Sequence, residues 1–348
     1  MIPYTQLPST NRQNLMDILP LKKPFTLLIE PSSLCNFKCV QCFQSLKEDN
    51  YFSRQRCNMP MAIYEKVIYQ MKEWNSEKLK VLKLSLYGEP LLNPDFCEML
   101  RIASEANIAE RIETTTNASL LTEKISEKLV EYQLDYIRVS IYSANQHRHE
   151  EITGTKFDIK NIHKNLMRLQ EIKKNIGSNR PFVALKMLDT YGPENDAFFN
   201  MYTDVADEMY IDKPHNWIKS SKGKFTDFLY KGNFALANED MRKDLIPRRA
   251  CPMAFTTMAV RSNGDIAPCC IDFIGGTNLG KINEINLREL WNSDVWLKFL
   301  TMQLEGRKHE NHSCTHCDFY MSDYYTKDNI DDFDVKKLRN RRNDNKER

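Results

Sequence analysis

Short apolar runs alternate with stretches of helical periodicity between Phe25 and Asp212. Six runs rich in β-branched or large apolar residues predict strands: Phe25–Glu30, Val81–Leu86, Arg111–Thr116, Tyr136–Ile141, Phe182–Leu188 and Glu208–Asp212. The intervening periodicity predicts helices that include Met61–Trp74, Pro94–Asn107 and Thr122–Tyr132. Pro94 suits a first helical turn and Thr122 an N-cap. Because strand–helix repeats favour right-handed parallel crossovers, the predicted fold class is α/β, an open partial (β/α)6 TIM-like barrel.

The rest of the chain divides by composition. We predict a polar N-terminal arm over residues 1–24, the partial barrel over 25–220, a weakly periodic bridge over 221–250, a small C-terminal domain over 251–322 and a polar tail over 323–348. Residues 336–348 hold seven basic and two acidic residues, which is typical of a solvated, mobile tail. A chain of 348 residues is long enough for a barrel and a smaller appendage.

The amino-acid composition limits the kinds of molecule that the protein is expected to bind and its expected location. The net charge of +2 gives no electrostatic case for nucleic acid, so a small-molecule substrate is expected. No run approaches the 18 apolar residues of a membrane span, and the first 24 residues lack the apolar stretch of a signal peptide. A cytoplasmic location is therefore expected. In a reducing compartment the ten cysteines point to metal binding or catalysis rather than to disulfides.

Three cysteines stand close together after the first predicted strand. Cys35, Cys39 and Cys42 fall in the loop 31–45, at the strand ends where barrel chemistry gathers. Structural zinc normally takes four protein ligands, whereas a cubane cluster held by three thiolates leaves one iron open to another ligand. The spacing therefore favours an iron–sulfur cluster, and a zinc loop completed by a distant His or Cys is the alternative.

The Cys-x3-Cys-x2-Cys spacing resembles that of the radical S-adenosylmethionine (SAM) superfamily. The resemblance implies a 4Fe-4S cluster whose fourth iron is chelated by S-adenosyl-L-methionine. Reductive cleavage of that cofactor would give a 5′-deoxyadenosyl radical that abstracts hydrogen from the substrate. The resemblance also implies an electron donor such as flavodoxin or ferredoxin.

Three further segments match positions of this family in the expected order. The cofactor-binding residues that the resemblance implies are Gly88, Glu89, Pro90, Thr116, Asn117 and Ser140. The backbone and acid of the Gly-Glu-Pro element would receive the methionine ammonium, although Tyr87 stands where the family usually has a first Gly. Without the resemblance, these residues would be interpreted as an ordinary turn, a polar strand end and a core hydroxyl.

A second cysteine group follows the bridge. Cys251, Cys269, Cys314 and Cys317 resemble the ligands of the Twitch and SPASM auxiliary iron–sulfur domains. Gly264 permits the tight hairpin turn between the first two. Asp323 stands where a full SPASM pattern has a further Cys, so one auxiliary 4Fe-4S cluster is expected. Cys270 could replace Cys269 as a ligand, and structural zinc is the alternative for the site.

The single auxiliary site resembles that of radical dehydrogenases of the 2-deoxy-scyllo-inosamine dehydrogenase type. We therefore predict an oxidoreductase acting on a sugar or cyclitol alcohol, with the auxiliary cluster accepting one electron. A radical peptide- or protein-modifying enzyme or an epimerase is the second reading, and a non-catalytic zinc-binding adaptor is the third. His215 is a candidate substrate base, although a hydrogen-bonded structural His is the more ordinary interpretation.

Overall fold

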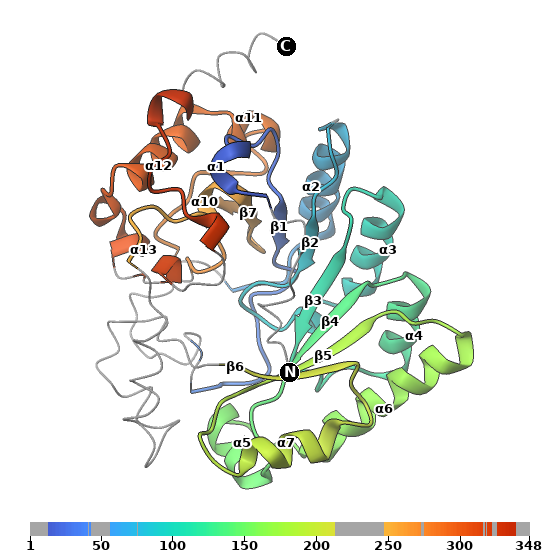
Figure 1. The fold of residues 1–348 in the computed structure, drawn as a ribbon. Helices are drawn as coiled ribbons and strands as arrows, with labels where there is room; N and C mark the ends of the chain where they lie inside the picture. The colour runs from blue at the N-terminus through green and yellow to red at the C-terminus, as the bar shows by residue number, and fades with distance from the viewer. Residues whose placement is uncertain are drawn as a thin grey trace.

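The strands form one continuous sheet (Figure 1). The computed structural model describes residues 13–40, 42, 56–74, 76–212, 247–272, 275–315, 317, 319–321 and 326–338. The sheet order is β6-β5-β4-β3-β2-β1-β7-β8-β9. Its strands are β1 (Thr26–Ile29), β2 (Val81–Leu84), β3 (Ile112–Thr116), β4 (Tyr136–Ser140), β5 (Phe182–Leu188), β6 (Glu208–Asp212), β7 (Thr257–Val260), β8 (Asp265–Ala267) and β9 (Gly280–Lys281). The pairs from β6 through β1 to β7 are all parallel, whereas the β7–β8 and β8–β9 pairs are antiparallel.

The six predicted strands and the mixed α/β class are confirmed, with two strands at their predicted bounds and four shorter by one or two residues. Helices cover the outer face of this sheet in Figure 1. They are α2 (Met61–Glu73), α3 (Phe96–Ala106), α4 (Glu123–Glu131), α5 (Gln146–Thr153), α6 (Ile159–Ile176) and α7 (Glu194–Tyr202). The C-terminal part adds α10 (Met253–Thr256), α11 (Leu287–Trp291), α12 (Asp294–Leu304) and α13 (His312–Thr315).

The first residues of α4 and α3 test two predictions about where helices begin. Thr122 caps α4, since its side chain accepts a hydrogen bond from the Ile125 amide. The expectation that Pro94 lies in the first turn of its helix is wrong, because α3 begins two residues later. Asn93 explains the delay: its side chain accepts from the Asp95 amide and so holds this segment in a turn.

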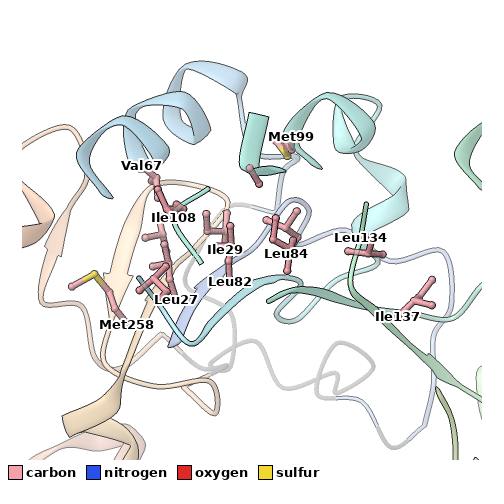
Figure 2. Packing of buried hydrophobic residues seen from close by; sticks show 14 of the residues in the cluster. Leu27, Ile29, Val67, Leu82, Leu84, Met99, Ile108, Leu134, Ile137 and Met258 are labelled. Atoms are coloured by element: carbon pink, nitrogen blue, oxygen red, sulfur yellow. The ribbon is translucent and has the colours of Figure 1, made fainter. Parts of the chain in front are cut away.

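Successive side chains of each strand point to opposite faces of the sheet, and the two faces differ in polarity. Leu27 and Leu82 point toward the helices, where Val67 of α2 contributes to the same buried layer (Figure 2). The next residues, Leu28 and Lys83, are partners in the β1–β2 register and face the opposite, concave side. The apolar core thus lies between sheet and helices, which leaves the concave face for polar side chains.

The C-terminal part is built onto the barrel edge. Strand β7 pairs in parallel with β1, opposite Thr26–Ile29, and the β7–β8–β9 segment extends the same sheet. The Glu30 carboxylate accepts hydrogen bonds from both the amide and the hydroxyl of Ser262. The hairpin turn uses Gly264 at φ +85°, as its position predicted. Buried apolar residues of both parts belong to a single cluster, so the two parts share one core.

Both ends of the described chain pack on this C-terminal part. Helix α1 (Leu15–Ile18) lies beside the C-terminal helices in Figure 1. The expectation of a solvated tail is wrong for residues 326–338, because Ile330, Phe333 and Leu338 are buried in the core. The basic residues that follow dominated the composition and concealed these apolar anchors. The predicted bridge, apart from residues 247–250, and His215 lie outside the described residues.

Within the described ranges, none of the helices combines the length and the apolar character that a bilayer crossing requires.

Replacing Ile330 by Ala should lower the free energy of unfolding by about 2–5 kcal/mol, because it removes a fully buried side chain from the core. Ile176→Ala is the matched control, since that side chain is 61% exposed. Denaturant titration of the two variants measures the difference. Equal effects would mean that the segment is a solvated tail after all.

Candidate active site

The loop that follows β1 is fixed to the rest of the barrel by its backbone. The Lys38 amide donates to the Thr153 carbonyl and the Val40 amide to the Ile152 carbonyl, both at 2.8 Å. The Cys42 amide donates to the carbonyl of Cys39 at 2.9 Å. The end of α5 therefore holds the turn that carries the second and third cysteines of the motif.

The three thiols of this loop gather at one place. Cys39 is buried, and burial together with nearby Cys42 raises the pKa of its thiol. Burial likewise raises the pKa of Cys35 to about 11. Buried thiols become thiolates readily only beside positive charge, which bound iron supplies. The donor set fits a cluster held by Cys35, Cys39 and Cys42.

The Gly-Glu-Pro turn after β2 touches the cysteine loop directly. A Cβ atom on Gly88 would lie 2.2 Å from the Ser32 carbonyl oxygen and 2.5 Å from that of Leu34. The Glu89 amide donates to this same Leu34 carbonyl at 2.8 Å. Only glycine permits so close an approach of two backbones, which accounts for the residue at position 88.

The carboxylate of Glu89 links the ends of two strands. It is 2% exposed and accepts from the Thr116 hydroxyl at 2.6 Å, the Asn117 amide at 2.8 Å and the Leu91 amide at 3.2 Å. Burial raises its pKa to about 7, and these bonds oppose the rise. The side chain thus braces the β2 and β3 ends. Its predicted contact with a methionine ammonium stays a prediction.

Asn117 joins the third strand end to the cysteine loop. Its side-chain amide donates to Asn36 Oδ1 at 2.9 Å, and Asn36 Nδ2 donates to the Ser119 hydroxyl at 2.8 Å. Ser140 lies half-buried at the end of the neighbouring strand β4. The predicted cofactor residues of β2, β3 and β4 therefore border the cysteine loop along one edge of the sheet, as the strand order requires.

The second cysteine group lines one pocket. Cys251, Cys269, Cys314 and Cys317 reach it from the start of α10, the end of β8 and the α13 turn. Burial raises the pKa of Cys251 to about 12, with nearby Cys317 adding to the rise. Cys270 does not line this pocket. It packs instead with Leu28 and Ala259 on the concave face of the sheet.

Polar side chains complete the pocket. Gln303 Nε2 donates to Cys314 Sγ at 3.3 Å. The buried Arg261 and Asp272 form an ion pair at 2.5 Å. Lys308 also lines the pocket, and its buried ammonium has no hydrogen-bond partner among the residues that the structure describes. A buried, unsatisfied cation beside four thiols fits an anionic metal cluster.

Across the described part of the chain, no three His, Cys, Asp or Glu side chains converge closely enough to hold a single metal ion. Four cysteines that line one pocket are the ligand set of either a structural zinc site or a 4Fe-4S cluster.

The concave face of the sheet carries charged side chains close to Cys270. Lys83 pairs with Glu113 at 3.5 Å, and Lys186 pairs with Asp212. Arg138 of the intervening strand lies close enough to influence both lysines. Burial lowers the pKa of Lys83 to about 8, and Arg138 lowers it further. This face therefore offers several donors and acceptors to a polar ligand.

Family comparisons agree with this geometry. Residues 29–183 match the radical SAM superfamily, and residues 251–318 match SPASM, an iron–sulfur cluster-binding domain. The chain is a radical SAM enzyme with a C-terminal SPASM domain. It accordingly uses S-adenosyl-L-methionine and 4Fe-4S clusters. That Cys35, Cys39 and Cys42 hold one of these clusters stays a prediction. The predicted family and cofactors are confirmed.

Three known proteins place the chain among its relatives. It is 22% identical over 333 residues to the tungsten-containing aldehyde ferredoxin oxidoreductase cofactor-modifying protein of Pyrococcus furiosus, covering 84% of this chain and 86% of that one. It is 21% identical to the S-adenosyl-L-methionine-dependent 2-deoxy-scyllo-inosamine dehydrogenase of Niallia circulans, covering 85% and 94%. The crystal structure of Streptococcus suis SuiB bound to S-adenosylmethionine has a TM-score of 0.60 at 19% identity, covering 86% and 73%. The structural likeness concerns the fold.

Several side chains near these sites carried no sequence signal. Tyr142 hydrogen-bonds Cys39 from the end of β4, and Asn36 is one of the variable residues of the cysteine motif. Tyr87 was noted only as a departure from the family pattern. In the radical SAM fold of this chain Tyr87 is half-buried, and its buried hydroxyl lies close to Cys269 and Arg261, so this side chain runs from the turn after β2 toward the second cysteine group.

Gly88→Ala should reduce S-adenosylmethionine cleavage by on the order of 100-fold, because the new methyl group must push the cysteine loop away from the turn. Gly192→Ala is the matched control, since its Cβ would meet nothing closer than 3.8 Å. Anaerobic assays of methionine release compare the two. Normal cleavage by Gly88→Ala would show that the two segments need not touch.

Cys269→Ser should remove the auxiliary cluster, whereas the adjacent Cys270→Ser should retain it, because only Cys269 lines the pocket with the other three thiols. Iron and sulfide analysis of anaerobically purified protein, with electron paramagnetic resonance (EPR), distinguishes the two variants. The opposite pattern would make Cys270 the ligand.

Proposed function

We propose that this enzyme is a radical dehydrogenase that oxidises an alcohol of a sugar or cyclitol, with the auxiliary 4Fe-4S cluster as electron acceptor. The observation that carries the proposal is the polar concave face of the sheet beside the auxiliary cysteine group. Lys83 and Glu113 lie on it, and Cys270 packs at its border close to Cys317 of the auxiliary pocket. The proposal puts the substrate on this face, within reach of both cofactors.

The side chains of this face suit a polyhydroxylated molecule. Each substrate hydroxyl can donate to a carboxylate such as Asp212 and accept from a cation such as Lys186. Buried polar groups reject analogues that lack a hydroxyl because the protein groups are then left unpaired. These residues would bind and orient the substrate, and the apolar border formed by Leu28, Ala259 and Leu86 would help to exclude water.

When bound, the cofactors supply a 5′-deoxyadenosyl radical at one side of this face and a one-electron acceptor at the other. The substrate class is supported by the Niallia circulans relative, which is named for the dehydrogenation of an aminocyclitol and aligns over 85% of this chain. The Pyrococcus furiosus relative is named for cofactor modification, so modification of a larger substrate is the competing outcome of the test.

Anaerobic turnover with aminocyclitols, sugars and peptides tests the proposal. A dehydrogenase removes a hydrogen atom from the carbinol carbon and then one proton and one electron, so the product should be lighter by two hydrogens. Deuterium at that carbon should appear in 5′-deoxyadenosine. An unchanged product mass would indicate an epimerase, and turnover of peptides alone would indicate a peptide-modifying enzyme. Either result would overturn the proposal.

Two sets of cysteine variants should separate the steps. Replacing Cys35, Cys39 and Cys42 by Ala should abolish cofactor cleavage, because no open iron remains. Replacing Cys314 and Cys317 should leave cleavage measurable and block formation of the oxidised product. Cys97→Ser is the control, since Cys97 lies in α3, away from both groups. Cleavage retained by the first set would contradict the assignment of the cluster.

A further inference from the structure

Lys308 differs from its neighbours in the turn that follows α12. The 3-10 helix Lys308–Glu310 begins here, and the side chain of the preceding Arg307 is 41% exposed and forms ion pairs with Glu305 and Glu310. Lys308 instead turns inward to the auxiliary pocket, where its ammonium lies 2.8 Å from the centroid of the Tyr320 ring. A lysine in an otherwise solvated turn is thus placed among the metal-binding thiols.

Among the residues that the structure describes, the charged groups around this ammonium do not pair with it directly. Asp272 is bound to Arg261, so that pair is neutral as a unit. Asp331 lies near enough to act on Lys308, but its carboxylate accepts from the backbone amides of Arg249 and Ala250. Burial lowers the pKa of Lys308, and the pocket cysteines Cys251 and Cys314 are the main groups that oppose this shift.

Burying an unpaired ammonium costs several kcal/mol, and a fold retains one where a negative charge compensates for it. A 4Fe-4S cluster held by four thiolates carries net negative charge, and reduction adds one more negative charge. A fixed cation beside the cluster therefore stabilises the reduced state more than the oxidised state.

We propose that Lys308 is the counter-charge of the auxiliary cluster and that, together with Gln303, it raises the reduction potential of that cluster so that it accepts an electron readily. Gln303 is 1% exposed and donates to the sulfur of Cys314 at 3.3 Å. Hydrogen bonds to cluster sulfurs and nearby charge are two recognised determinants of such potentials. Both act through the cluster, so Lys308 and Gln303 are positioning residues that need not touch the substrate.

This inference concerns the auxiliary site itself and can be tested without a substrate. EPR-monitored redox titration of the anaerobically prepared full-length enzyme gives the midpoint potentials of both clusters. The auxiliary signal is the one absent from Cys269→Ser. Lys308→Met removes the charge while keeping an unbranched side chain, and Lys308→Arg keeps the charge. Lys281→Met is the matched control, because Lys281 is an exposed lysine of the same domain.

Lys308→Met should lower the equilibrium constant for reduction of the auxiliary cluster at least tenfold, which equals 59 mV for a one-electron couple. Lys308→Arg and Lys281→Met should keep the potential near that of the wild type, and the signal of the first cluster should not move. If Lys308→Met loads no auxiliary cluster, Lys308→Gln, which keeps a polar group, gives the measurement.

A fully loaded Lys308→Met or Lys308→Gln enzyme with the potential of Lys281→Met would overturn the inference. Failure of the dehydrogenase proposal would appear differently, as absence of the oxidised product while the shift in potential persists.

Discussion

Strand β1 is the element on which the rest of the structure depends. It is only four residues long, yet it pairs with β2 on one side and with β7 on the other. The first cysteine loop begins directly at its end, and Glu30, its next residue, binds the Ser262 turn of the C-terminal part. Main-chain hydrogen bonds on both edges leave such a strand little freedom, so both cofactor regions are fixed to one frame.

At the two cysteine groups, burial disfavours the charged forms of side chains, and the polypeptide alone does not compensate for this cost. Thiols such as Cys39 and Cys251 have raised pKa values because burial disfavours their charged forms. The Lys308 ammonium carries the opposite charge, and its nitrogen is likewise buried, without a hydrogen-bond partner among the described residues. Iron–sulfur clusters resolve both, since iron stabilises the thiolates and the anionic assembly compensates the cation. Folding and cluster insertion are therefore expected to be thermodynamically coupled at these sites.

The sequence was a good guide where local periodicity and motif spacing decide the structure. The six barrel strands follow from their apolar runs, and the three-cysteine spacing predicted the superfamily that the comparisons show. Leu27 and Ile29 face the helices and Leu28 faces the opposite side of the sheet. This alternation is also a local property, because successive residues of a strand point to opposite faces.

Features that depend on distant partners could not be predicted. Thr257–Val260 is a short buried segment, and nothing in its composition indicates that it pairs with β1. Lys308 stands in a run of polar residues, several of them exposed, so the sequence does not indicate that its side chain points inward. The choice between Cys269 and Cys270 as a ligand depends on which thiol points into the pocket. The sequence places the two cysteines side by side and does not indicate the direction of either side chain.

The shared strand also has a consequence for damage by oxygen. Iron–sulfur centres near solvent are prone to oxidative breakdown, and here both would be seated on the same four-residue ribbon. Loss of iron from the C-terminal pocket would remove the electron acceptor, while the main-chain pairing of β7 with β1 would still hold the first cysteine loop in place. The injured enzyme would then go on splitting its cosubstrate without completing the oxidation, so oxygen would turn a productive catalyst into one that wastes cosubstrate.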